Sequence, residues 1–189
     1  MRIGFFGGSF NPPSNIHIDL AKNVIEKYKL DRILFVPVGD YYNKDDLVSA
    51  KHRLNMLKLA IENKEKLEVE EIATNSKVNL YAIDTFNLIT KKYKNNDIYF
   101  IMGSDNFRKM PTWHSYKELI NNYNIIVIER ERQEIRKQNR NNIHEFIPCS
   151  LYNVDSTKIR RMIKNNEPVK ELLDDKVYKY IIDNNLYKE

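Results

Sequence analysis

The feature that most constrains the fold is a repeated pattern of short apolar strand, turn and amphipathic helix at the start of the chain. Residues 2–6 form an apolar run that ends at two glycines, and residues 15–30 then place apolar side chains at helical spacing. The pattern repeats at once, with residues 32–36 as a strand and residues 50–63 as a helix. Because two successive strands joined through a helix lie parallel in one sheet, the sequence predicts an α/β protein.

The rest of the chain continues this alternation. Strands are predicted at residues 67–72, 97–102 and 124–128 and from residue 146, and helices at residues 81–93 and from residue 156 onward. The whole pattern predicts a single domain over residues 1–189, with an open, doubly wound, Rossmann-like parallel sheet and a helical segment at residues 156–189. Ligands bind to such sheets beyond the carboxyl ends of the strands, so residues that directly follow strands are the candidates for a site.

Length and composition favour a single domain without an internal disulfide or a membrane span. A length of 189 residues with 42% hydrophobic content suits one domain, and a net charge of +5 favours phosphate-bearing partners without choosing among nucleotides, RNA and lipid headgroups. The only cysteine, Cys149, excludes an internal disulfide. No apolar run approaches the ~20 residues of a membrane span, and the first residues are unlike a signal peptide, so we expect a cytoplasmic protein. Residues 129–142 carry both signs of charge, which favours a solvated segment over a nucleic-acid patch.

A glycine turn follows the first predicted strand, with the sequence Gly-Gly-Ser-Phe-Asn-Pro-Pro-Ser-Asn-Ile-His from residue 7 to residue 17. Two glycines let the backbone pass close to a bulky ligand, and the next helix points its positive end at the same place. The turn is neither a Walker A loop nor the spaced glycine pattern of dehydrogenases. An anion site is one interpretation, in which His17 donates to phosphate oxygens; a plain turn capped by Ser14 or Asn15 is the other.

A second candidate segment lies near the other end, where Asp155 is followed by Ser-Thr-Lys-Ile-Arg-Arg. Ser156 and Thr157 can cap the last helical region while their hydroxyls and amides donate hydrogen bonds to a phosphate. Arg160, one helical turn later, can reach the same oxygens. Capping alone would explain the two hydroxyl residues but not the arginine.

Three residues between these segments each allow two interpretations. Trp113 is the only tryptophan and is either a hydrophobic plug or a stacking platform. Asp105, at the end of a predicted strand, either accepts hydrogen bonds from ribose hydroxyls or caps its loop. Lys44, in a polar loop, either pairs with a phosphate or is simply exposed to solvent.

Together, the glycine turn with its histidine and the Ser-Thr-Lys-Ile-Arg segment resemble the two signatures of the nicotinamide/nicotinate mononucleotide adenylyltransferase family, within the nucleotidylyltransferase superfamily. The resemblance extends over almost the whole chain in the right order. The motifs between the signatures are similar as well. Residues 37–44 with His52 and Arg53 resemble the mononucleotide-binding loop and the helix behind it, and residues 81–85 resemble the helix start that faces the pyridine. Residues 103–105 resemble the turn that holds the ATP ribose, and residues 111–113 resemble the segment with the stacking tryptophan.

One departure concerns the start of the helix after the glycine turn. The wider superfamily usually has His-x-Gly-His there, whereas this chain has Ser14-Asn15-Ile16-His17, so only the second histidine is kept. The eukaryotic-type enzymes also have a sequence similar to Asn-x-His at this point, so the loss of the first histidine does not itself indicate inactivity. It places more of the phosphate binding on His17.

The resemblance implies transfer of AMP from ATP to a pyridine mononucleotide in NAD biosynthesis, by in-line attack without a covalent enzyme intermediate. Mg²⁺ would be held mainly by the ATP phosphates. The roles it implies are catalysis by His17 and Arg160, ATP binding by Gly8, Ser9, Phe10, Gly103, Asp105, Ser156 and Thr157, and mononucleotide binding by Asn11, Lys44, Arg53, Thr85 and Trp113.

Several alternatives stay open. Enzymes of the same fold could transfer a nucleotidyl group to phosphopantetheine, glycerol phosphate or choline phosphate, and the last two reactions are cytidylyl transfers. Outside the enzyme class, the alternatives are a basic RNA-binding module and a catalytically silent relative. A fragment of a class I aminoacyl-tRNA synthetase is disfavoured, because 189 residues leave no room for tRNA-binding parts. We expect ATP and a pyridine mononucleotide as partners and neither nucleic acid nor membrane. Homo-oligomerisation and the choice between nicotinate and nicotinamide stay open.

Overall fold

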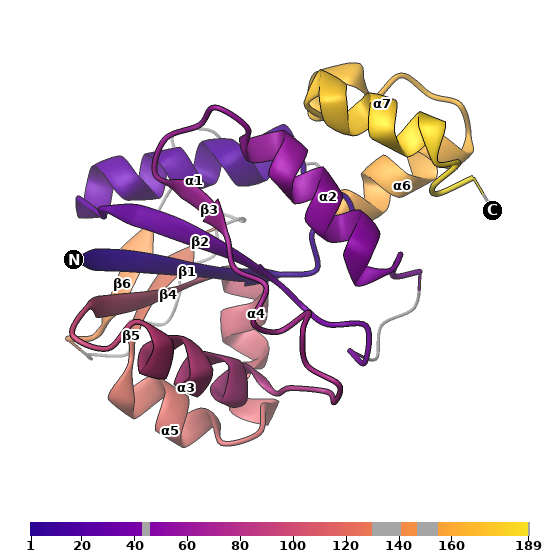
Figure 1. Cartoon of the computed structure of the whole chain (residues 1–189). Coiled ribbons are helices and arrows are strands. Elements are labelled where there is room, and N and C mark those ends of the chain that lie inside the picture. The colour runs from indigo at the N-terminus through magenta and orange to yellow at the C-terminus, as the bar shows by residue number, and fades with distance from the viewer. Residues whose placement is uncertain (43–45, 130–140, 147–154, 189) are drawn as a thin grey trace.

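The computed structural model describes residues 1–42, 46–129, 141–146 and 155–188. Its strands are β1 (Arg2–Gly8), β2 (Arg32–Pro37), β3 (Leu67–Val69), β4 (Asp97–Gly103), β5 (Asn124–Ile128) and β6 (Ile143–Phe146). All six described strands run parallel in one sheet of order β3-β2-β1-β4-β5-β6 (Figure 1). The order reverses between β1 and β4, which is where such a sheet binds its ligand. The predicted doubly wound sheet is confirmed.

Helices cover both faces of this sheet (Figure 1). The helices are α1 (Asn15–Tyr28), α2 (Ala50–Ile61), α3 (Ala82–Lys92), α4 (Ser104–Lys109), α5 (Tyr116–Asn122), α6 (Ser156–Lys164) and α7 (Asp175–Asp183), with 3-10 turns η1 (Met110–Thr112) and η2 (Lys170–Leu172). Helices α1 and α2 lie on one face, and α3, α4 and α5 on the other. Among the described residues, no helix has the length and apolar character needed to cross a membrane.

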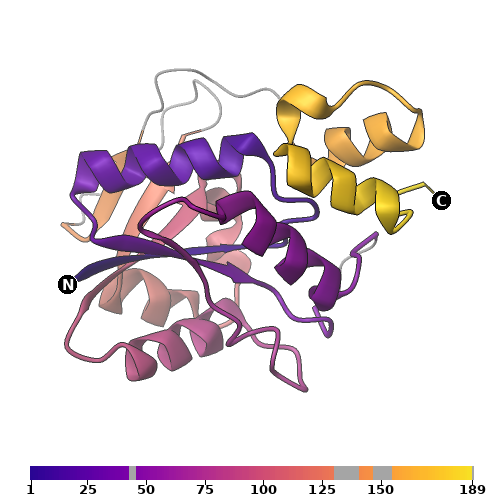
Figure 2. The same ribbon diagram turned by 45° about the horizontal axis from the view of Figure 1, so that its top comes forward.

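The two C-terminal helices lie beyond the carboxyl end of β1 (Figures 1 and 2). Helix α7 is attached to α2 by the hydroxyl of Tyr180, which lies 3.0 Å from the His52 Nδ1 atom and accepts from the Asn55 side-chain amide at 2.9 Å. Helix α6 is thereby brought to the edge of the sheet where ligands are expected. The predicted helical segment from residue 156 is interrupted at Asn166, which adopts a left-handed conformation with φ of 56°.

Each central strand contributes to two hydrophobic cores, one on each face of the sheet. Phe5 packs with the side chains of α3, α4 and α5, whereas its neighbour Phe6 packs with those of α1, α2, α6 and α7. In β2, Leu34 packs in the same core as Phe5, and Phe35 packs in the same core as Phe6. Because both faces are covered, the strands need near-continuous apolar runs, and this is why they were recognisable in the sequence.

The structure corrects several predicted boundaries. Strand β3 ends at Val69 instead of residue 72, and β6 begins at Ile143 instead of residue 146. Helices α4 and α5 were not predicted, because each is too short to show a clear apolar period. Lys44, Cys149 and residues 130–140 of the charged segment lie outside the described residues.

A close backbone approach behind β2 gives a test of this packing. A Cβ atom added at Gly39 would lie 2.6 Å from the carbonyl oxygen of Ala73, and backbone cannot move aside as a side chain does. We expect Gly39→Ala to lower the free energy of unfolding by about 1–3 kcal/mol, the usual cost of overpacking, measured by urea denaturation. Gly7→Ala is the control, because its nearest contact would be the Phe100 ring at 3.4 Å. Equal losses in the two variants would contradict the account.

Candidate active site

The turn that follows β1 is held in one tight conformation. The carbonyl of Gly8 accepts a hydrogen bond from the Val38 amide at 3.0 Å, which ties the turn to the end of β2. Phe10 is buried and adopts a left-handed conformation with φ of 46°, which is strained for an aromatic residue. Its ring lies so close to Gly8 that an added Cβ atom there would be 3.0 Å from it. Any larger residue at position 8 would therefore have to displace the Phe10 ring.

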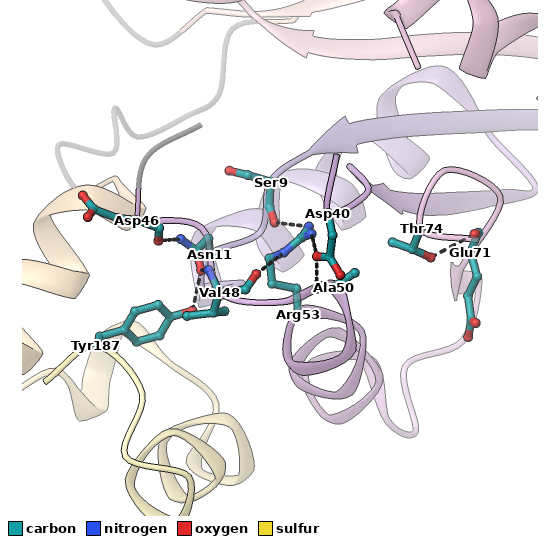
Figure 3. A network of polar contacts seen from close by, with 10 residues as sticks. All are labelled: Ser9, Asn11, Asp40, Asp46, Val48, Ala50, Arg53, Glu71, Thr74 and Tyr187. Carbon is teal, nitrogen blue, oxygen red and sulfur yellow. Dashed lines mark hydrogen bonds and ion pairs between the residues drawn. The ribbon is translucent and has the colours of Figure 1, made fainter. Parts of the chain in front are cut away.

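Asn11 is a buried link between three segments of the chain (Figure 3). Its side-chain amide donates to the Asp46 carbonyl at 2.6 Å, and its Oδ1 atom accepts from the Val48 amide at 3.4 Å and the Tyr187 hydroxyl at 2.8 Å. Burial raises the pKa of the Tyr187 hydroxyl, which keeps that donor protonated. The Asn11 side chain thus holds together the turn after β1, the loop at residues 46–48 and the C-terminal tail.

Arg53 has the same linking role on the other side of the turn (Figure 3). It is fully buried in α2, and its guanidinium donates to the carbonyls of Val48 at 2.8 Å and Ser9 at 3.2 Å and pairs with Asp40 at 3.4 Å. Burial lowers the pKa of the guanidinium, and the Asp40 carboxylate opposes this effect. In this structure Arg53 therefore holds the walls of the site together and does not face solvent.

Helix α6 packs directly on the glycine turn. The Ser156 hydroxyl donates to the Pro12 carbonyl at 2.9 Å, and the Arg160 guanidinium donates to the Asn11 carbonyl at 3.0 Å. The cap of the helix is Asp155, whose Oδ1 atom accepts from the Lys158 amide at 2.7 Å, instead of Ser156 or Thr157 as the sequence suggested. The hydroxyl groups of the motif are therefore not used as the cap, and Thr157 is an exposed residue.

His17 lies in the first turn of α1, beside the same glycine turn. The backbone amide of Ser14 donates to its Nδ1 atom at 3.1 Å, and the Ser14 hydroxyl lies 2.8 Å from that atom. The ring also packs edge-on against Phe10, with centroids 5.4 Å apart. Because Nδ1 accepts from an amide, the neutral ring carries its proton on Nε2, which makes that atom a hydrogen-bond donor. The backbone amide of Ser14 thus sets the tautomer.

A second group of predicted residues lies at the end of β4 and the start of α3. Gly103 precedes α4, whose first turn holds the half-buried Asp105. Trp113 follows η1 and packs against the core cluster that α3 and α5 share. Thr85, in the first turn of α3, is buried, and its hydroxyl donates to the Tyr81 carbonyl at 3.3 Å.

An aromatic pair that the sequence did not predict joins these elements. The rings of Tyr81 and His114 stack with centroids 4.5 Å apart and planes 25° apart. Tyr81 was visible as part of a helix start, but no sequence signal linked it with His114, which is far along the chain. The pair places the residue that follows Trp113 over the start of α3, so the Thr85 and Trp113 neighbourhoods border one another.

The predicted site residues therefore form two groups along the carboxyl edge of the sheet. His17, Ser156 and Arg160 gather around the turn after β1, whereas Gly103 ends the adjacent strand β4 and Asp105 follows it. Within the part of the chain that is described, no three His, Cys, Asp or Glu side chains come together as a metal site.

The linking role of Arg53 can be tested by its removal. Arg53→Met keeps the apolar stem but leaves the Ser9 and Val48 carbonyls without their donor, so we expect a loss of about 1–3 kcal/mol in the free energy of unfolding. Urea denaturation measures this loss. Lys51→Met, at an exposed position of the same helix, is the control and should change it little. An Arg53 variant as stable as the control would show that these bonds do not hold the loops.

The sequence and the structure were compared with known proteins. Residues 5–162 match the cytidylyltransferase-like family model. A probable nicotinate-nucleotide adenylyltransferase of Borreliella burgdorferi is 35% identical over 99% of this chain and 97% of its own length, and the nicotinate-nucleotide adenylyltransferase of Bacillus subtilis is 32% identical over 99% and 98%. The solved structure of the Plasmodium falciparum nicotinic acid mononucleotide adenylyltransferase complexed with NaAD has a TM-score of 0.86 at 21% identity, over 98% of this chain and 97% of that one.

Proposed function

Since this chain belongs to the nicotinate-nucleotide adenylyltransferase family, we propose that it transfers the AMP part of ATP to the 5′-phosphate of nicotinate mononucleotide. The protein is an adenylyltransferase of NAD biosynthesis with nucleotide substrates. The observation that carries the assignment of its residues is the contact of Ser156 and Arg160 with the turn after β1, because it unites the two signature segments in one place.

The proposed reaction forms one P–O bond and breaks another. An oxygen of the mononucleotide phosphate attacks the α-phosphorus of ATP, and the bond to the bridging oxygen of the β-phosphate breaks, so that pyrophosphate leaves with the electron pair. We assign no covalent intermediate to the protein. The residues would act by positioning and by stabilising negative charge, with His17 donating from Nε2 and Arg160 supplying a fixed cation. Gly8, Ser9 and Phe10 would present the turn backbone to the phosphates, with Ser156 and Thr157 opposite.

The second group of residues would bind the two bases and sugars. Asp105, in the turn after Gly103, would accept hydrogen bonds from the ATP ribose. Trp113 would offer a face to the pyridine ring, with Thr85 and the stacked Tyr81–His114 pair beside it. The buried positions of Asn11 and Arg53 support indirect roles, in which they hold the mononucleotide loop without touching the ligand.

Magnesium is proposed to enter the reaction as part of the ATP substrate. A hard cation of this kind keeps several waters and binds phosphate oxygens readily, so it needs few protein ligands. Within the described parts of the chain, His, Cys, Asp and Glu side chains do not gather in threes as a protein-made cage would require. We therefore assign the ion to the phosphates of ATP, as part of the substrate.

The role of His17 predicts a large kinetic effect. His17→Ala removes one preorganised donor, so kcat is expected to fall by roughly 10²–10³, equivalent to about 2.7–4 kcal/mol of transition-state stabilisation. Steady-state pyrophosphate release measures the change. His144→Ala is the control, because His144 lies in β6 between Tyr28 and Tyr99 and faces no proposed substrate. Near-normal turnover in the His17 variant would remove this residue from the mechanism.

The substrate assignment is tested by a direct comparison of acceptors. The purified chain is assayed with MgATP and either nicotinate or nicotinamide mononucleotide, and both pyrophosphate and the dinucleotide are quantified. We expect kcat/KM to be higher for the nicotinate compound by at least about tenfold, which a site that pairs a carboxylate can supply. A reversed preference would overturn the choice of acceptor, and no dinucleotide from either would overturn the proposed activity.

A further inference from the structure

We propose that a basic groove beside α6 binds the diphosphate group that the reaction releases, an inference that rests on the proposed function. This α6 groove has a volume of about 750 Å³, within the usual range of small-molecule sites. It lies between α6, residues 46–48 and the C-terminal tail. Its polar lining includes Thr157, Arg160, Arg161, Lys164, Lys188 and Asp46.

The charges in the α6 groove are strongly unequal. Four cationic side chains line it, from Arg160, Arg161, Lys164 and Lys188, against the single carboxylate of Asp46. Within the described residues none of the four forms an ion pair: Arg160 donates to a backbone carbonyl, and Lys188 donates to the amide oxygen of Asn185. Cations that are not neutralised inside a concave surface concentrate positive potential there. The groove is therefore suited to an anion that carries several charges.

Helix α6 turns its basic side chains toward the groove and its apolar side chains toward the core. Ile159 and Ile163 on its opposite side are buried in the core, whereas Arg160, Arg161 and Lys164 share the face that lines the groove. The chain then turns back so that the tail adds a fourth cation, Lys188, from a distant part of the sequence. Two separate elements thus contribute positive charge to one cavity.

The α6 groove adjoins the glycine turn through Asn11. Arg160, which lines the groove, donates to the Asn11 carbonyl, and Tyr187, which also lines it, donates to the Asn11 side chain. A phosphate group in the groove would thus lie next to the turn at which the α-phosphorus is proposed to react. The groove is lined by Thr157 and Arg160 from the second signature, so it continues the proposed phosphate site along α6.

This position suits the leaving group of the proposed reaction. When the bond between the α-phosphorus and the bridging oxygen breaks, that oxygen takes the electron pair and the diphosphate gains negative charge. Guanidinium groups can bind such oxygens with two parallel hydrogen bonds, and lysine adds a point charge. The new assignment is that Arg161 and Lys164, with Lys188 opposite, hold the released diphosphate.

The reverse reaction tests this assignment, because it uses pyrophosphate as a substrate. The double variant Arg161→Gln/Lys164→Gln is assayed with the dinucleotide and magnesium pyrophosphate. We expect the KM for pyrophosphate to rise by about tenfold, the effect of losing roughly 1.4 kcal/mol of binding, with the KM for the dinucleotide unchanged. In the forward direction, product inhibition by pyrophosphate should weaken by the same factor, and the KM for the mononucleotide should stay the same.

The control is the double variant Lys158→Gln/Lys170→Gln, which removes the same net charge from exposed positions outside the groove lining. A pyrophosphate KM equal in the two double variants would overturn the assignment. So would a change confined to the mononucleotide KM, which would place the mononucleotide phosphate in the groove. If the unmodified protein catalyses the reaction in neither direction, the proposed function fails. Titration calorimetry with pyrophosphate then still tests whether the α6 groove binds diphosphate. Binding that the Arg161/Lys164 variant loses supports the assignment, and absence of binding overturns it.

Discussion

Two hydrogen bonds by which α6 holds the turn after β1 bring the two signature segments together. Ser156 and Arg160 donate to the carbonyls of Pro12 and Asn11, which are 144 and 149 residues away in sequence. Without these bonds the C-terminal helices would still pack on α2, but their hydroxyl and guanidinium groups would not meet the glycine turn. The attachment of α7 through Tyr180 brings α6 to the carboxyl edge of the sheet, and the two bonds then fix its register there.

A layer of buried polar side chains supports this contact. Asn11 and Arg53 have no exposed surface, and each has bonds to groups from separate loops. Burial of such groups is costly unless they are hydrogen-bonded, so their satisfied geometry favours one arrangement of the loops over others. Donors fixed before a reaction need little reorganisation when charge develops, and this is the form of catalysis proposed here. The strained backbone of Phe10 fits the same interpretation.

Much of the fold could be predicted from the sequence, because a parallel sheet covered on both faces requires strands that are apolar throughout. The two signature segments were also recognisable, since both place polar residues directly after a strand or at a helix start. Less could be predicted where a residue's environment depends on distant parts of the chain. Nothing in the sequence around Arg53 shows that its side chain is buried, yet the buried residues of α2 are Ala50, Arg53, Met56, Leu57 and Ala60. The contacts of Asn11 with Tyr187 and of Tyr81 with His114 have no local signature at all.

The most direct test of the central claim is hydrogen exchange of backbone amides with and without a non-hydrolysable ATP analogue. The claim is that the turn after β1 and the start of α6 bind the same triphosphate. Peptides covering residues 7–12 and residues 156–161 should therefore both gain protection, with the same dependence on analogue concentration. Protection of only one of the two peptides, or of neither at saturating analogue, would contradict it.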